Sequence, residues 1–138
     1  MPKDPLHKVV LHDRDGNTTF GFAYQTDFAE EIRIITREGK AQTVPLSRLK
    51  AVFFVRDFKG DPEYQAVQFL NKAPASEKLW VRVRFEDGEV IEGRVNNGLD
   101  LLTRPGFYLW PSDSESNNVS IFIPKSAVVA FSILAANH

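Results

Sequence analysis

The chain contains no cysteine among its 138 residues, and it has one methionine and three histidines. The lack of cysteine excludes disulfide bonds, thiolate metal sites and a cysteine nucleophile. No apolar run approaches the roughly 20 residues that a membrane-spanning helix needs. A charge excess is also missing, since 17 basic side chains stand against 18 acidic ones. Nucleic acid is therefore an unexpected partner, because non-specific phosphate binding depends on a basic surplus.

The opening stretch MPKDPLHKVVLHDRDG has charges and prolines where a signal peptide needs an apolar segment. Together with the missing cysteine, this favours a cytoplasmic protein without membrane contact. We expect no cofactor.

Groups that commonly carry catalysis are scarce. The histidines are His7, His12 and the terminal His138, and no serine or carboxylate pair lies in a recognisable nucleophile or acid/base setting. The stretch DRDGNTT at 13–19 places oxygen ligands at alternating positions, as a calcium loop does. However, it lacks the glycine at position six and the glutamate at position twelve that such a loop requires. We therefore expect neither an enzyme nor a metal site.

Strand signals dominate the chain, which is 43% hydrophobic and 12% aromatic. Short apolar runs alternate with turn dipeptides such as Asp-Gly at 15–16 and 87–88. Each half of the chain holds five such runs in the same order. The predicted strands lie near 8–13, 18–25, 31–37, 40–44 and 50–56, and near 80–86, 89–96, 106–110, 119–123 and 127–133.

Two phrases occur once in each half. DRDGNTTFG at 13–21 and FEDGEVIEG at 85–93 both place a glycine five positions after Asp-Gly. In the same way, VPLSRLKAVFF at 44–54 parallels IPKSAVVAFS at 123–132, with a proline, a serine two residues later and then an apolar strand. Each proline is expected to end a strand and open a single 3₁₀ turn. The sequence therefore indicates a tandem repeat.

Five short strands with a 3₁₀ turn before the last resemble an SH3-like or Sm-like barrel. We predict a mainly β protein of two tandem five-stranded barrels joined by one short helix, with 1–58 as the first barrel, 59–79 as the helical connector and 80–138 as the second barrel. The helix is expected over 62–71, after an Asp-Pro start. The alternative is a single ten-stranded β-sandwich or barrel.

The two halves differ in their outer faces. In the second half, alternation around 81–95 predicts a three-residue hairpin loop at 86–88, with Arg82 facing Glu92. In the first half, the corresponding outward positions include the aromatic residues Phe20, Phe22 and Tyr24. We expect this aromatic stripe to contact the other half, the connector helix or another chain.

Arg33 and Arg37 form an R-x-x-x-R spacing similar to the arginine pair with which PilZ domains bind cyclic di-GMP, although the D/N-x-S-x-x-G element that should follow is missing. The segment KAVFFVRDFKGDPEY at 50–64 resembles one in small uncharacterised bacterial proteins grouped with PilZ-like domains. The resemblance implies a cyclic-dinucleotide or nucleotide sensor that uses Arg33, Arg37 and Arg56.

The stretch GFAYQTDFAEEIRI at 21–34 resembles the first Sm motif, with Gly21 and Asp27 in place. Glu31 stands where that motif has asparagine, and the second motif, which lies beside the uridine pocket, is replaced by Val-Pro-Leu at 44–46. The residues that build a barrel are kept, while those that recognise RNA are lost. The resemblance thus implies the fold and argues against Sm-type function.

These patterns favour a non-catalytic binding or scaffolding module that docks a protein partner or self-associates, through an open barrel edge or exposed aromatics. A nucleotide sensor of PilZ-like type is the first alternative. A weak nucleic-acid binder that uses Arg82, Arg84 and Arg94 is the second.

Overall fold

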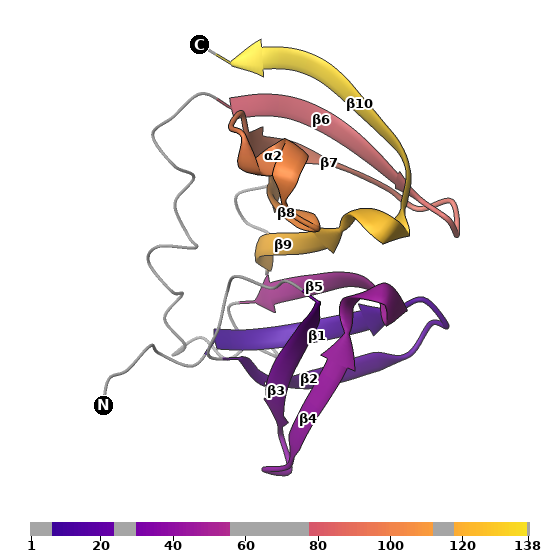
Figure 1. Cartoon of the computed structure of the whole chain (residues 1–138), viewed down its shortest axis with the longest axis vertical. Helices are drawn as coiled ribbons and strands as arrows, with labels where there is room; N and C mark the ends of the chain where they lie inside the picture. Colours follow the sequence, from indigo (N-terminus) through magenta and orange to yellow (C-terminus); the bar gives the residue numbers. More distant parts are fainter. Residues whose placement is uncertain (1–6, 24–29, 56–77, 112–117, 138) are drawn as a thin grey trace.

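The structure is a computed structural model, and it describes residues 7–23, 30–55, 78–111 and 118–137. Its strands form one antiparallel sheet in the order β10-β6-β7-β8-β9-β5-β1-β2-β3-β4 (Figure 1). The strands of the first half are β1 (His7–Asp13), β2 (Thr18–Ala23), β3 (Glu31–Thr36), β4 (Ala41–Pro45) and β5 (Leu49–Val55). Those of the second half are β6 (Lys78–Phe85), β7 (Val90–Asn96), β8 (Gly106–Pro111), β9 (Asn118–Pro124) and β10 (Val128–Asn137).

All ten predicted strands are present, with ends shifted by a few residues. The two expected 3₁₀ turns also occur, as η1 (Leu46–Arg48) and η2 (Lys125–Ala127). Each follows a proline whose backbone is extended, because proline fixes φ and cannot donate to a sheet ladder. One short helix, α2 (Asp100–Thr103), lies where the sequence predicted only a loop. The predicted connector helix at 62–71 lies outside the described residues.

The hairpin between β6 and β7 has the predicted register. Arg82 lies opposite Glu92, and its Nε donates a 2.7 Å hydrogen bond to Glu92 Oε2. The amide of Phe85 donates to the carbonyl of Glu89, which leaves a three-residue loop between them. Gly88 in that loop has φ +94°, a left-handed conformation that glycine adopts without strain.

The sheet does not close into barrels. Instead, β5 of the first half pairs with β9 of the second, with Val52 opposite Phe122 and Phe53 opposite Ile121. The prediction of two tandem five-stranded barrels is therefore corrected to one open sheet whose ends are β4 and β10. The alternative of a single ten-stranded unit agrees with this continuous sheet, although the sheet does not close as a ten-stranded barrel would.

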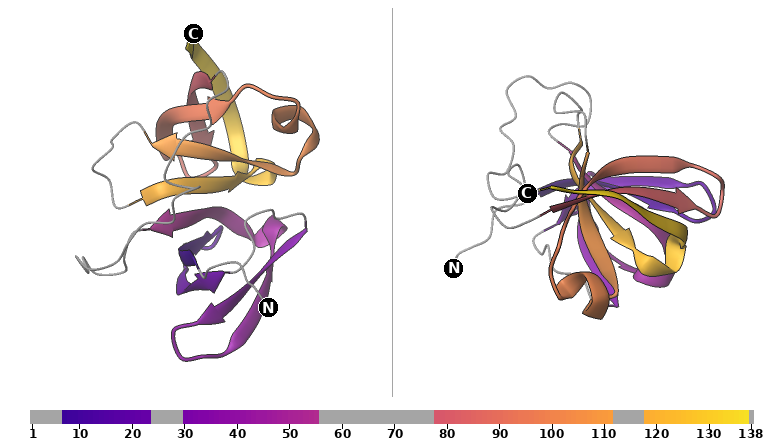
Figure 2. Two further views of the ribbon diagram at one scale, coloured as in Figure 1. Left: turned by 90° about the vertical axis from the view of Figure 1, so that its left-hand side faces the viewer. Right: turned by 90° about the horizontal axis from the view of Figure 1, so that it is seen from above.

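The sheet has two curled halves, stacked with β5 and β9 between them (Figure 2). Alternate residues of these two strands enter different cores. Phe54 and Phe122 pack into the first core, whereas Ala51 and Ile121 pack into the second. β5 and β9 are therefore buried on both faces, which explains their nearly continuous apolar sequence.

The cores are built mainly from one half each, with a contribution from the other half at the junction. The first core contains Val9, Leu11, Ala23, Ile32, Ile34, Leu46, Leu49, Val52, Phe54 and Phe122. The second contains Ala51, Leu79, Val81, Val83, Phe85, Val95, Phe107, Leu109, Ile121, Ile123 and Ala127. Because each core includes residues from both halves, the two halves are parts of one packed unit.

Candidate binding pocket

A pocket of about 310 Å³ lies between helix α2 and strands β7, β8 and β9 of the second half. The residues that line it are Val95, Asn96, Gly98, Leu99, Asp100, Leu101, Arg104, Gly106, Phe107, Tyr108, Trp110 and Phe122.

Local sequence explains why a helical turn covers this pocket. Asn-Gly at 97–98 is a strong turn dipeptide, and it leads directly into the first helical turn, where the Leu101 amide donates to the Gly98 carbonyl. The amide of Arg104 then donates to the Asp100 carbonyl at 3.0 Å. Pro105 ends the helix, because the residue before a proline is driven to extended backbone, and Arg104 has φ −90° and ψ 157°.

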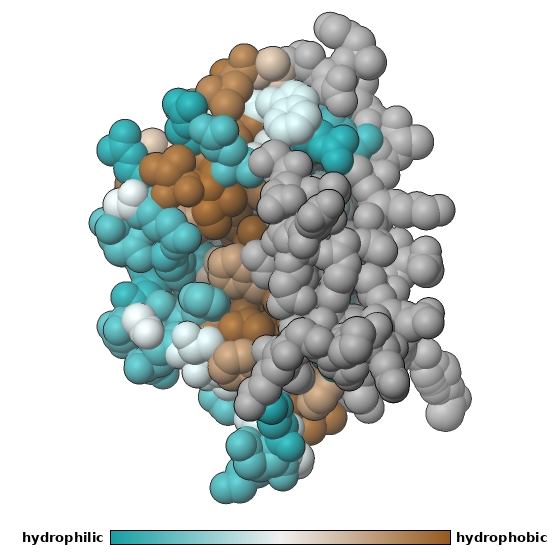
Figure 3. All heavy atoms as spheres, turned by 180° about the vertical axis from the view of Figure 1, so that it is seen from behind, coloured by the Kyte–Doolittle hydropathy of each residue, from teal (hydrophilic) through white to brown (hydrophobic). Residues whose placement is uncertain are grey.

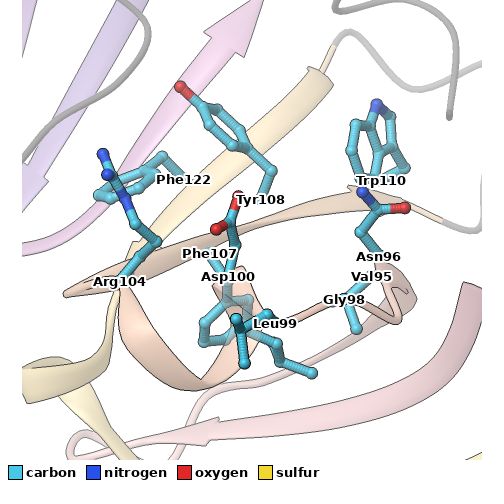
Figure 4. A pocket seen from close by; sticks show the side chains of 12 residues that line it. Val95, Asn96, Gly98, Leu99, Asp100, Arg104, Phe107, Tyr108, Trp110 and Phe122 are labelled. Atoms are coloured by element: carbon cyan, nitrogen blue, oxygen red, sulfur yellow. The ribbon is translucent and has the colours of Figure 1, made fainter.

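Aromatic side chains form the pocket's walls. Tyr108 and Trp110 project from β8 to the same side, and the side chains of Arg104 and Asn96 also line the pocket (Figure 4). The ring centroids of Tyr108 and Phe122 are 5.2 Å apart, and those of Tyr108 and Trp110 are 6.5 Å apart. These distances suit direct aromatic contact, so the walls are a packed apolar surface.

The α2 segment, of which Leu99 lines the pocket, combines exposed apolar side chains with opposite charges. Leu99 and Leu102 of the α2 segment are 72% and 78% exposed, although leucine is usually buried. Leu101 between them packs against the second core and anchors the turn. Asp100 and Arg104 are the charged residues of the lining, and their charges cancel.

A separate cluster of ion pairs joins the two halves at the β6–β7 loop. Lys50 of β5 donates to Asp87 Oδ2 at 2.7 Å and also to Glu89. Arg14 of the first half likewise bonds Glu86. Burial alone would lower the pKa of Lys50, but its hydrogen bonds to Asp87 and Glu89 outweigh that effect and raise it. The same bond from Lys50 lowers the pKa of Asp87.

The arginines proposed from the PilZ resemblance lie in the first half, away from the pocket lining. Arg33 is exposed on β3, opposite Thr43 of β4. Arg37 follows β3, and its guanidinium lies 5.5 Å from the centroid of the Phe20 ring. Arg56 lies outside the described residues. Nucleotide binding by these three side chains stays a prediction.

Part of the predicted aromatic stripe is placed by the structure. Phe20 lies opposite Val10, which lies opposite Phe53 of β5, and both phenylalanines are half-buried. Phe53 packs against the second core, so this row of side chains leads from β2 to the other half. Phe22 is also half-buried, and Tyr24 lies outside the described residues. An interface through these residues stays a prediction.

The arginines of the nucleic-acid alternative are largely engaged with other side chains. Arg82 is bonded to Glu92, and the guanidinium of Arg94 lies 5.5 Å from the Trp80 ring centroid. Arg84 is exposed and lies opposite Val90. The three side chains therefore do not form one free basic surface.

Within the described ranges, no group of three or more His, Cys, Asp or Glu residues is arranged to hold a metal ion. The same part of the chain contains no helix long and apolar enough to cross a membrane.

The class that these observations define is a β protein with one open ten-stranded sheet and an aromatic pocket on one side. The chain belongs to the family described as "Family of unknown function (DUF6982)", whose family model matches residues 6–135. No curated protein matches the chain, and no solved structure matches it.

The pocket residues were not predicted from the sequence. One available signal was GFYLW at 106–110, whose apolar residues do not alternate with polar ones. A strand of this kind is buried on both faces, so a second covering element near it could have been expected. The other signal was the pair Leu99 and Leu102 beside an Asn-Gly turn.

Proposed function

We propose that this protein is a non-catalytic binding module that docks a segment of a protein partner in the α2 pocket. The observation that carries the proposal is the combination of an apolar, aromatic-walled pocket with two highly exposed leucines of the α2 segment, Leu99 in the lining and Leu102 three residues further along. Exposed large apolar residues around a concave apolar site are typical of protein interaction surfaces.

The occupant we propose is an extended segment that inserts one bulky apolar side chain. Trp110 and Phe122 are themselves mostly buried, so they offer a preformed wall against which such an anchor packs. Anchors of this kind supply most of the binding energy at protein interfaces. The two leucines would then cover the inserted side chain and exclude water from it.

The charge of the lining favours a protein segment over a nucleotide. A phosphate group needs a concentration of cations or free backbone amides, whereas the described residues of the lining include one guanidinium, Arg104, and one carboxylate, Asp100. A peptide, which has both donors and acceptors along its backbone, matches this mixed rim better.

The test is a selection of displayed random peptides against the full chain, followed by NMR mapping of the selected peptides. We expect them to carry a bulky apolar residue and to shift the amide signals of 95–110 and of Phe122. The double variant Leu99→Asp/Leu102→Asp should bind them about tenfold or more weakly, a loss of about 1.4 kcal/mol. Val90→Asp is the matched control, because Val90 is 48% exposed at the other end of β7.

Two outcomes would overturn the proposal. One is that selected peptides shift signals away from the pocket. The other is that the double variant and the Val90 control bind the peptides equally well, since the rim leucines would then make no contact with them.

A further inference from the structure

Within the described residues, β4 and β10 each pair with one neighbouring strand, so both are edges of the sheet. They lie at opposite ends of the molecule (Figure 1). β10 is the longest strand and exposes four large apolar side chains, which are Val129, Phe131, Ile133 and Leu134. Apolar surface is visible at this end of the molecule from behind as well (Figure 3). A long apolar edge invites pairing with another strand.

β10 occupies in the second half the place that β5 occupies in the first. Leu11 pairs with Val52 of β5, and Val83 pairs in the same way with Phe131 of β10. In both strands the register shifts near the start, at Lys50 and at Val129 respectively. β5 and β10 are therefore equivalent edges, residue by residue.

The equivalent residues differ strongly in exposure. Val52 is 0% exposed and its counterpart Phe131 is 37% exposed, while Phe54 is 2% exposed and its counterpart Ile133 is 59% exposed. The cause is the neighbouring strand, since β9 pairs with β5 and adds Phe122 to the first core. No described strand lies against the corresponding side of β10.

β4 in turn occupies the place of β9. Glu31 pairs with Pro45 at the end of β4, and Gly106 pairs with Pro124 at the end of β9. Each of these prolines leads into a 3₁₀ turn. The open edge of β10 is therefore equivalent to β5, and the open edge of β4 is equivalent to β9. Inside the chain, β5 and β9 pair with each other.

We propose that β10 of one copy of this chain pairs antiparallel with β4 of a second copy, in the register of the β5–β9 junction. The equivalences place Phe131 opposite Thr43, Ser132 opposite Gln42 and Ile133 opposite Ala41. This contact is head-to-tail, so each copy keeps one open edge of each type. Further copies then add until the assembly closes or extends as a filament.

The contact between copies is expected to be weaker than the junction within the chain. β4 presents Gln42 and Thr43 at the positions where β9 presents Ile121 and Phe122. Less apolar area is therefore buried between copies than between the halves. Association should be reversible and depend on protein concentration.

The test uses two single variants of the full chain, Gln42→Cys and Ser132→Cys, whose only thiols are the introduced ones because the chain has no cysteine. Both positions are exposed, so neither change disturbs the core. Under mild oxidation we expect a disulfide-linked dimer in the mixture of the two variants and none in either variant alone. Thr43→Cys mixed with Ser132→Cys is the register control, because neighbouring strand residues point to opposite faces.

A second measurement is sedimentation of the wild type from about 1 µM to about 1 mM, the range in which weak association is detected. We expect the average mass to rise with concentration, and Ile133→Lys, an exposed change, to abolish the rise. If Ser132→Cys alone formed the disulfide faster than its mixture with Gln42→Cys, the result would show symmetric β10–β10 pairing and overturn the proposal. Monomeric mass throughout, with no cross-link in the mixture, would also overturn it.

Discussion

At the scale of single residues, the conformation of the sheet depends on close backbone approach at glycine. A Cβ atom on Gly93, in the middle of β7, would lie 2.5 Å from Leu109 Cδ2 and would meet the carbonyl oxygen of Trp110. The sequence marked this glycine only by its place five positions after Asp-Gly, and the structure gives a physical reason for it. β8 lies so close that no side chain fits between the two strands.

Gly93→Ala should therefore lower the free energy of unfolding by about 1–3 kcal/mol, because β8 must move to admit the methyl group. Gly98→Ala is the matched control, since a Cβ there has no atom within 4 Å. Urea denaturation measures both. Equal stability of the two variants would show that β7 and β8 do not approach as closely as described.

Lys50 and Asp87 link the halves through an ion pair that depends on pH. The hydrogen bond from Lys50, followed by one from the Glu89 amide, lowers the pKa of Asp87 below its ordinary value of 3.8. A carboxyl group with a lowered pKa stabilises the fold while it is ionised. This stabilisation is complete above pH 3.8 and is lost as the pH falls through the lowered pKa.

Asp87→Asn should therefore be less stable than the wild type near neutral pH, and the difference should shrink as the pH falls below 3.8. Denaturant unfolding at a series of pH values measures this difference. Asp13 also has a lowered pKa, owing first to the Asn17 amide, so both proteins should retain some acid sensitivity. A difference that stays constant down to strongly acidic pH would contradict the role given to Asp87.

At the scale of elements, the β5–β9 junction carries the connection between the halves. Phe122 of β9 is 3% exposed, yet it belongs to the first core. Phe122→Ala should lower the free energy of unfolding by about 3–5 kcal/mol, as loss of a buried phenylalanine commonly does. Val129→Ala, at a 56% exposed position, is the control and should change stability little.

Hydrogen exchange then distinguishes a shared core from two independent ones. We expect Phe122→Ala to lower the protection of β1 and β2, although both belong to the other half of the chain. If only β6 to β10 lost protection, the halves would be separate folding units.

The elements themselves were largely predictable from the sequence. Short apolar runs between turn signals located every described strand, and alternation around the second Asp-Gly turn set the register between Arg82 and Glu92, because these signals are local. Helix α2 was missed, since four residues are too few to show a helical period. Its apolar residues were equally compatible with a loop.

At the scale of the whole molecule, the sequence did not predict which edges pair. β4 and β9 both end in a proline and a 3₁₀ turn, so local signals do not tell which of them pairs with β5. The choice follows from apolar side chains on both faces of β9, such as Ile121 and Phe122, which β4 lacks. The tandem repeat remains our interpretation, supported by the shared strand order of the halves.

The residues of the candidate site could not be predicted from local sequence signals either. The pocket combines residues from the end of β7, from α2, from β8 and from β9, and only pairing of these strands brings them together. Arg33 and Arg37, which were chosen for their spacing alone, lie in the other half. Spacing along one strand predicts a shared face, whereas a pocket depends on contacts between strands.

The measurement that tests the proposed function most directly is quantitative capture of proteins from native extract, treated with nuclease, on the full chain. The wild type, Leu99→Asp/Leu102→Asp and the control Val90→Asp are compared by mass spectrometry. We predict a protein that the wild type and the control retain equally and that the double variant retains about tenfold less. Equal retention by all three would contradict docking in the α2 pocket.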